Sequence, residues 1–102
     1  MKEYNKLVRD YIPQMIEENG NKALYHILSK EEYIEELDKK LNEEVMEYQQ
    51  DKSIDEMADI LEVLLAICKA RGYSEEELEN KRRVKANERG MFSNRIFLEY
   101  VE

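Results

Sequence analysis

The chain is poor in the residues on which several common kinds of site depend. It has one cysteine, Cys68, so no disulfide framework can form within it, and a reducing, cytoplasmic location is expected. Its one histidine, His26, cannot supply the ligands of a zinc site or of a di-iron helical bundle. Glycine occurs only at positions 20, 72 and 90, which excludes a glycine-rich phosphate loop.

Long apolar runs and a surplus of positive charge are also missing. The longest apolar stretch, Ile60–Cys68, is interrupted by Glu62 and is far too short to span a bilayer. The opening residues 1–6 lack the apolar run of a signal peptide. The formal net charge is -8, whereas a nucleic-acid binder needs a basic surface. We therefore expect neither a membrane nor a nucleic acid as a partner.

Charged residues, by contrast, make up 39% of the chain, and many fall in helical patterns. Three serines are each followed three residues later by a glutamate, which is the capping-box signature of a helix start. The pairs are Ser29 with Glu32, Ser53 with Glu56, and Ser74 with Glu77. They predict helices over residues 30–50, 54–71 and 75–89, and Gly72 and Gly90 end the last two.

The remaining segments complete a single all-α domain over residues 1–102. A short helix is expected over 13–19, and the apolar runs 23–28 and 95–101 read as short extended segments near the ends, which could pair. The linkers 51–53 and 72–74 are short, so consecutive helices should pack as an antiparallel bundle. A monomer of this size buries only roughly 60–65% of its unfolded surface, which favours an oligomer.

Two acidic pairs on successive helices are the most informative feature of the chain. Glu44 and Glu47 are spaced i,i+3, as are Glu56 and Asp59, so each pair leaves one side of its helix. Facing each other across a short turn, the four carboxylates would repel by roughly 3 kcal/mol per pair at about 5.5 Å. They must bind a cation, take up protons or splay into water. A site with oxygen ligands alone selects Mg²⁺, Mn²⁺ or Ca²⁺.

Helical periodicity predicts which way these carboxylates point. Glu44 borders the apolar stripe that contains Leu37, whereas Glu43 points nearly opposite and should be solvated. The next helix has a main apolar stripe and a second apolar face, and the second face, which also carries Glu56 and Asp59, is expected to meet another subunit. The stripe is Met57, Leu61, Leu64 and Cys68; the second face is Ile60, Val63 and Ile67. The alternative is that all four acids are ordinary solvated residues.

The last helix carries a basic stripe with little apolar content. It contains Leu78, Lys81, Arg82, Lys85 and Arg89. Lysine and arginine are the expected partners of phosphate oxygens, so Lys81, Arg82 and Lys85 are candidates to hold a phosphate chain beside a bound Mg²⁺. The alternative is a solvated face whose cations pair with the many glutamates of the chain.

Taken together, these motifs resemble the all-α nucleoside triphosphate pyrophosphohydrolases, which include MazG-like proteins, phosphoribosyl-ATP pyrophosphohydrolases and dimeric dUTPases. The acidic pattern is Glu43-Glu44-x-x-Glu47 followed by Glu56-x-x-Asp59. The opening Tyr4-Asn5-Lys6-Leu7-Val8-Arg9-Asp10-Tyr11-Ile12-Pro13, and Arg89-Gly90-x-Phe92 with Arg95-Ile96-Phe97-Leu98 near the end, look like a small MazG-like subgroup. One departure is the interval of eight residues between Glu47 and Glu56, which is shorter than usual in MazG proper.

This resemblance implies Mg²⁺-dependent hydrolysis of a nucleoside triphosphate, or of a related phosphoribosyl nucleotide, to the monophosphate and pyrophosphate, in the service of nucleotide-pool house-cleaning. By motif match, Glu44, Glu47, Glu56 and Asp59 would ligate the metal, with Glu47 also the candidate general base. Glu43, Arg89 and Arg95 are weaker candidates. The resemblance also implies a homodimer or tetramer with sites formed partly at subunit contacts. The competing hypotheses are a helical dimerisation or adaptor module without catalysis, and a degenerate member that binds nucleotide without turnover.

Overall fold

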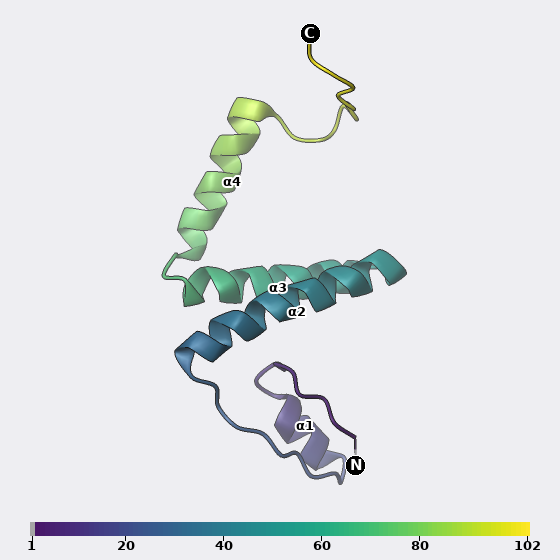
Figure 1. Cartoon of the computed structure of the whole chain (residues 1–102), viewed down its shortest axis with the longest axis vertical. Helices are drawn as coiled ribbons and strands as arrows, with labels where there is room; N and C mark the ends of the chain where they lie inside the picture. The colour runs from purple at the N-terminus through teal and green to yellow at the C-terminus, as the bar shows by residue number, and fades with distance from the viewer. Residues whose placement is uncertain (1) are drawn as a thin grey trace.

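The computed structural model describes residues 2–102, which form four helices joined by irregular segments (Figure 1). The helices are α1 (Ile12–Glu18), α2 (Lys30–Asp51), α3 (Ile54–Ala70) and α4 (Glu75–Arg89). The all-α prediction is confirmed, and the helix limits agree with the expected ones to within a residue. No strand occurs among residues 2–102, so the apolar segments 23–28 and 95–101 run without pairing.

The serine caps that predicted the long helices are present, although one differs from the expected form. Ser29 and Ser74 make complete capping boxes, in which serine accepts from the glutamate N–H and the glutamate carboxylate accepts from the serine N–H. At Ser53 the hydroxyl accepts from the Glu56 N–H at 3.3 Å, but the Glu56 carboxylate accepts no hydrogen bond from the Ser53 N–H. The prediction of a complete box was wrong here, and the Glu56 side chain is left free for another role.

Helices α2 and α3 pack against each other as an antiparallel pair, and this pair holds the small core of the chain (Figure 1). The buried apolar side chains are Leu37 from α2 with Val63 and Cys68 from α3. Only Lys52 and Ser53 separate the two helices. Lys52 adopts a left-handed conformation with φ 55° and its N–H bonds to the Tyr48 carbonyl at 2.8 Å, which turns the chain back sharply.

The apolar faces of α3 are buried differently from what was expected. On the second face, Val63 is buried within the single chain, and Ile60 and Ile67 are half-buried. The main stripe is divided, since Cys68 is buried whereas Met57, Leu61 and Leu64 are exposed. The open apolar surface of α3 therefore lies on the first part of its main stripe.

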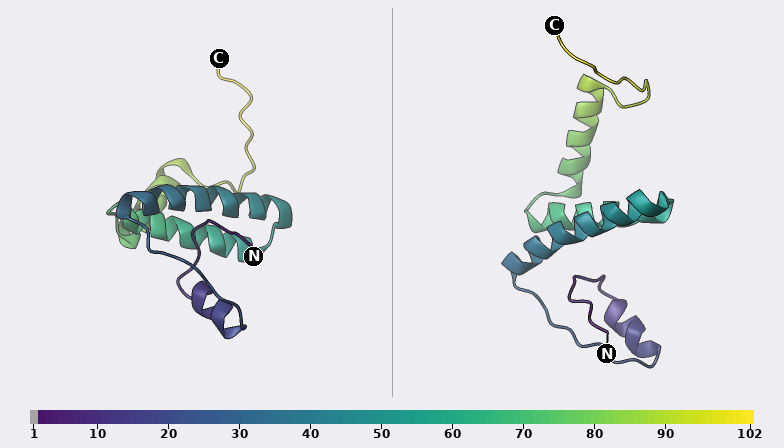
Figure 2. Two further views of the ribbon diagram at one scale, coloured as in Figure 1. Left: turned by 60° about the horizontal axis from the view of Figure 1, so that its bottom comes forward. Right: turned by 45° about the vertical axis from the view of Figure 1, so that its right-hand side comes forward.

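The other helices extend away from this pair, so a closed bundle is not formed within one chain. α4 contacts only α3, and α1 packs against no other helix among the described residues (Figure 2). The thiol of Cys68 donates to the Ser74 carbonyl at 3.3 Å and so joins the start of α4 to α3. The radius of gyration is 18.0 Å, whereas a compact domain of this length has about 13 Å.

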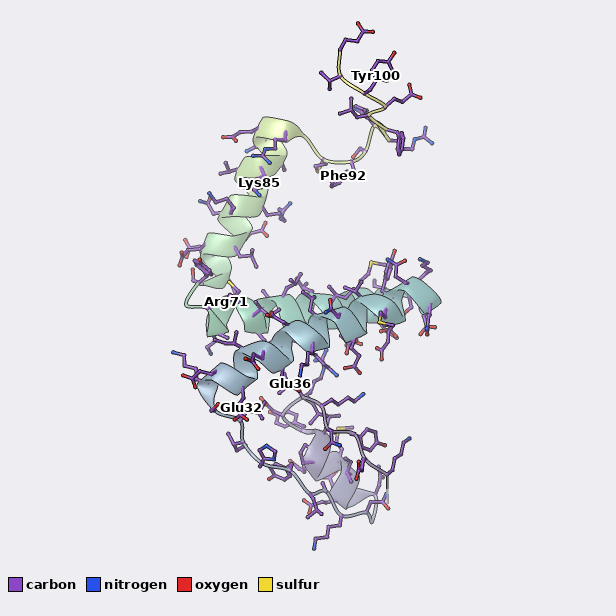
Figure 3. The ribbon with its side chains drawn as sticks, viewed as in Figure 1. Glu32, Glu36, Arg71, Lys85, Phe92 and Tyr100 are labelled. Carbon is purple, nitrogen blue, oxygen red and sulfur yellow. The ribbon has the colours of Figure 1, made fainter. Side chains whose placement is uncertain are left out.

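The segment after α4 is open to solvent over its whole length. It carries several large apolar side chains, and Phe92, at 96% exposed, touches almost nothing (Figure 3). Exposed apolar surface of this kind is costly in water. Within residues 2–102, no helix combines the length and the apolar character that crossing a membrane requires.

Candidate metal centre

The two acidic pairs converge at the turn end of the α2–α3 pair, as predicted. Glu44 and Glu47 come from the last turns of α2, and Glu56 and Asp59 come from the first turns of α3. One carboxylate oxygen from each residue lies within 4.8 Å of those from the other three. Four oxygen donors at this spacing form a set that could hold a hard divalent cation.

Glu44 is the least solvated member of the cluster, with 6% of its surface exposed. Burial raises the pKa of its carboxyl, and the neighbouring Glu47 raises the pKa further. Lys40 lies 3.4 Å from Oε1, one helical turn earlier on α2, and offsets part of this effect. The other oxygen, Oε2, is buried without any hydrogen-bond partner. A buried carboxylate oxygen without a partner is costly and needs an explanation.

Glu56, on the facing helix α3, also has a carboxylate oxygen without a partner. Its Oε2 atom is buried and makes no hydrogen bond. Burial raises the pKa of its carboxyl, contact with Glu47 lowers it in part, and the nearby carboxylates of Asp51, Asp59 and Glu44 raise it further. Two unpartnered oxygens from two helices at one spot indicate a missing positive charge there. The chemistry of the donor set and its unmet electrostatics therefore fit a Mg²⁺ or Mn²⁺ ion.

Glu43 is not solvated in the way that the helical projection predicted. Its carboxylate bonds to Lys6 at 2.8 Å and to Lys40 at 3.3 Å, and its side chain is 28% exposed. The Lys6 hydrogen bond lowers the pKa of Glu43, whereas Glu44, one residue on, has a raised pKa. The N-terminal segment, which the projection could not include, covers Glu43 and explains the difference.

Three basic residues beside the cluster were missed at the sequence level. Arg9 places Nη2 2.8 Å from Oδ1 of Asp59, and Lys6 reaches Glu43. These contacts join residues 50 and 37 positions apart, so no local pattern announces them. Lys40 was detectable, because its i,i+3 and i,i+4 spacing to Glu43 and Glu44 is the standard spacing of helical ion pairs.

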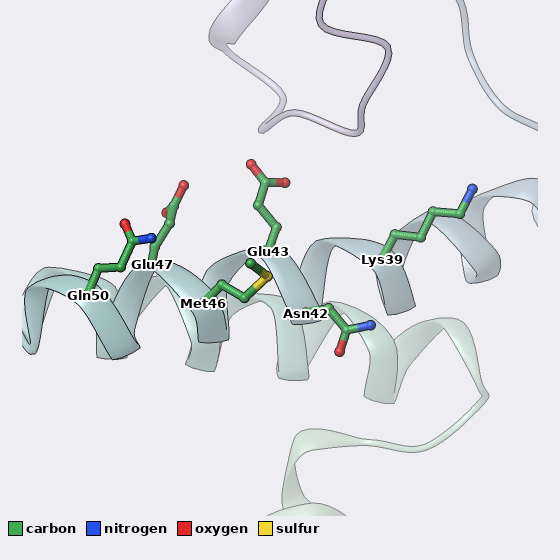
Figure 4. A pocket seen from close by; sticks show the side chains of 6 residues that line it. All are labelled: Lys39, Asn42, Glu43, Met46, Glu47 and Gln50. Carbon is green, nitrogen blue, oxygen red and sulfur yellow. The ribbon is translucent and has the colours of Figure 1, made fainter.

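A shallow hollow of about 470 Å³ runs along the side of α2 next to the cluster (Figure 4). Its lining residues are Lys39, Asn42, Glu43, Met46, Glu47 and Gln50. In Figure 4 the carboxylate of Glu43 points towards the N-terminal segment that passes over this side of the helix. Glu47 belongs both to this hollow and to the acidic cluster, so a ligand lying in the hollow would reach the cluster directly.

The candidate phosphate residues Lys81, Arg82 and Lys85 lie on α4, which begins at the opposite end of α3 from the cluster (Figure 1). Between Asp59 and Ala70, α3 alone spans about 16 Å. Within one chain the structure therefore does not bring these residues to the acidic cluster. Their assignment to phosphate stays a prediction, and it now requires α4 of a second copy.

The other basic candidates are placed similarly. Arg82 pairs with Glu79 on its own helix, and Arg83 shares that carboxylate, which is the self-paired arrangement foreseen as the alternative. Arg89 ends α4, and Arg95 lies in the exposed tail with a left-handed φ of 57°. Neither contacts the four carboxylates.

Comparison of the chain with protein-family models, with curated proteins and with solved structures finds no match. What the fold and the site define together is an all-α, four-helix protein with an acidic cluster able to hold a metal ion. The resemblance to the all-α pyrophosphohydrolases rests on the sequence motifs.

Proposed function

We propose that this chain is a Mg²⁺-dependent hydrolase that converts a nucleoside triphosphate, or a phosphoribosyl nucleotide, to the monophosphate and pyrophosphate. The observation that carries the proposal is the convergence of four carboxylates within 4.8 Å, two of which have a buried oxygen without a partner. The motif resemblance supplies the substrate class. A cytoplasmic location accords with the single free thiol of Cys68.

Each residue of the cluster has a defined part in this activity. Glu44, Glu47, Glu56 and Asp59 would hold Mg²⁺ through oxygen. When bound, Mg²⁺ (or Mn²⁺) neutralises phosphate charge and lowers the pKa of a coordinated water. Glu47 belongs to both the cluster and the lining of the hollow, which supports it as the candidate to accept the proton of the attacking water. The water oxygen would bond to phosphorus as the bridging P–O bond between the α- and β-phosphates breaks, and the monophosphate and pyrophosphate would be released.

The alternative of a helical adaptor with a merely solvated acidic face fits the cluster less well. A solvated face has no reason to keep Glu44 at 6% exposure with an unpartnered oxygen. Natural structures contain few such groups, and each costs about 1–3 kcal/mol. The exposed apolar surface that favours an adaptor is equally expected of an enzyme that works as an oligomer.

A second copy of the chain is part of the proposal, as a homodimer or a tetramer. Each chain buries only three apolar side chains and leaves the Met57, Leu61 and Leu64 stripe of α3 open. An apolar stripe of this kind on a central helix normally meets another helix. Association through it would also give α4 of one copy the opportunity to approach the cluster of another.

The direct test is a product assay with a panel of nucleoside triphosphates and Mg²⁺. We expect release of pyrophosphate together with the nucleoside monophosphate, and no release after chelation of the metal. Orthophosphate as the first product would show that a different bond is cleaved. The absence of turnover for every nucleotide, with retained metal binding, would favour the non-catalytic alternatives.

A further inference from the structure

The N-terminal segment, residues 2–11, makes two ion pairs at the acidic end of the α2–α3 pair. Lys6 Nζ lies 2.8 Å from Glu43 Oε1, and Arg9 Nη2 lies 2.8 Å from Asp59 Oδ1. The helix that follows, α1, packs against no other helix among the described residues. The two cations of the segment therefore join it to carboxylates on both α2 and α3.

The balance of charge at this spot explains why those cations are recruited. Six carboxylates gather here, namely Glu43, Glu44, Glu47, Asp51, Glu56 and Asp59, and three basic side chains lie among them, namely Lys6, Arg9 and Lys40. The carboxylates outnumber the basic side chains, so negative charge remains that a cation would offset. Lys6 and Arg9 thus serve as counter-ions to a cluster that is still short of positive charge.

The three basic residues differ in how firmly they are held. Lys40 belongs to α2 and is only 16% exposed, so its own helix holds it beside Glu43 and Glu44. Arg9 is 57% exposed and reaches Asp59 from outside the helical pair. A divalent ion ligated by Asp59 repels a guanidinium that approaches the same carboxylate. Arg9 is therefore the side chain that a metal would dislodge.

We propose that Arg9 exchanges partners during ligand binding: it pairs with Asp59 before the metal binds and holds the phosphate oxygens of the ligand afterwards. This inference rests on the metal site proposed above and names a ligand-binding residue for it. A guanidinium suits both partners, since its fork of N–H groups fits a carboxylate and a phosphate alike. Arg9 reaches the cluster within a single chain, whereas the basic residues of α4 lie beyond the far end of α3 and do not reach it.

The test uses the full chain with two probes, Mn²⁺ alone and inorganic pyrophosphate in the presence of saturating Mn²⁺, each titrated calorimetrically. If Arg9 exchanges partners, the substitution Arg9→Ala should change the affinities for the two probes in opposite directions. Mn²⁺ should bind several-fold more tightly, because a competing cation has gone. Pyrophosphate should bind about tenfold more weakly, because a charge-assisted contact has gone. Arg9→Lys should fall between the wild type and Arg9→Ala for pyrophosphate.

A matched control is available at the other end of the α2–α3 pair. Arg71 also pairs with an aspartate of a different element, since its Nη2 lies 3.5 Å from Oδ2 of Asp38, and both side chains are exposed. Arg71→Ala removes the same side chain and the same kind of ion pair away from the cluster. Both affinities should equal those of the wild type.

The outcomes separate this inference from the proposed function. Weaker binding of both probes to Arg9→Ala would mean that Arg9 only orders the cluster, and would overturn the exchange. Unchanged binding of both would overturn it as well, while leaving the metal site intact. A wild-type chain that binds no Mn²⁺ would instead overturn the metal site itself, and the exchange with it.

Discussion

The two ends of α3 show contrasting ways of satisfying charge and apolar surface. At its first turns, carboxylates from α2 and α3 meet inside one chain, and Glu44 is buried among them. At its last turns, α4 leaves the helical pair, its arginines bond to a glutamate of their own helix, and the following tail leaves Phe92 96% exposed. One chain is thus sufficient to assemble the acidic cluster, whereas α4 and the tail leave most of their surface exposed in the single chain.

The strongest challenge to this contrast is the removal of two cluster charges with Glu47→Gln and Asp59→Asn together. We expect pyrophosphate release to fall by at least about a thousandfold, because metal ligation and the general base are lost together. Thermal unfolding with and without Mg²⁺ should show that the stabilisation by metal, about 2.7 kcal/mol at a hundred times the dissociation constant, has vanished.

The matched control for that variant is Glu35→Gln with Glu62→Gln, which removes one exposed carboxylate from each of the same two helices. Its activity and its response to Mg²⁺ should equal those of the wild type. If the cluster variant kept the Mg²⁺-induced stabilisation, the metal would have to bind elsewhere.

The proposed association of two copies through α3 is tested by Leu61→Arg, which places a charge in the centre of the open stripe. Leu61 is 55% exposed in the single chain, so the substitution disturbs no packing within it. An unpaired charge in an apolar interface costs several kcal/mol, and we therefore expect a shift from oligomer to monomer in light scattering. Activity should fall about a hundredfold, while the helical signal of circular dichroism remains.

Leu24→Arg is the control for this change, because Leu24 is the same residue type and is also exposed, but lies outside the helices. It should leave the molar mass unchanged. A Leu61→Arg chain with the mass of the wild type would show that the α3 stripe is not the interface.

The contribution of α4 across subunits is tested with Lys81→Ala and Lys85→Ala in one chain. Loss of two phosphate contacts should raise KM about tenfold or more. Mixing this chain with the Glu47→Gln, Asp59→Asn chain should restore turnover below KM, because one copy then brings an intact cluster and the other an intact α4. If the mixture shows no recovery, the cluster and α4 do not act across subunits, and the proposed contribution of α4 to the cluster of another copy is wrong.

The smallest expected effect is on the stability of the metal-free chain as a function of pH. The pKa values of Glu44 and Glu56 are raised above 4.5, so the folded state takes up protons at a higher pH than the unfolded chain does. In the presence of a chelator, Tm should therefore rise by a few degrees as the pH falls from 7 through these pKa values. The lowered pKa of Glu43 acts in the opposite sense and removes stability only as the pH falls below about 4.5.

Glu44→Gln should flatten this pH profile, since it removes the most buried of the titrating groups. Glu35→Gln, at an exposed position of the same helix, should leave the profile unchanged. A wild-type Tm that falls steadily from pH 7 downwards would show that the cluster does not carry unrelieved negative charge.

The helices and the cluster could be predicted from the sequence because both depend on local spacing. Serine caps and glycines mark helix ends with their neighbours alone, and i,i+3 spacing fixes where the carboxylates leave a helix. The burial of Val63 within one chain was not predicted, because both apolar faces of α3 have helical periodicity. Periodicity alone does not decide that Val63 and Cys68 are buried while Leu61 stays exposed.

The N-terminal contacts could not be predicted for a different reason. Lys6 and Arg9 lie in an irregular segment, and nothing in its periodicity specifies which distant carboxylates they reach. The same holds for Glu43, whose exposure depends on that segment and not on its own helix. Long-range ion pairs between exposed side chains are set by the path of the whole chain.

The Lys52–Ser53 connection has a consequence for recognising further chains of this kind. It turns the chain back through a left-handed Lys52 and begins α3 at the Ser53 cap, whose hydroxyl accepts from the Glu56 N–H. The connection thus constrains the conformation of these two residues and the start of the helix that carries Glu56 and Asp59. A search pattern should therefore specify the four acids and the serine cap before Glu56, and leave open the number of residues between Glu47 and that cap.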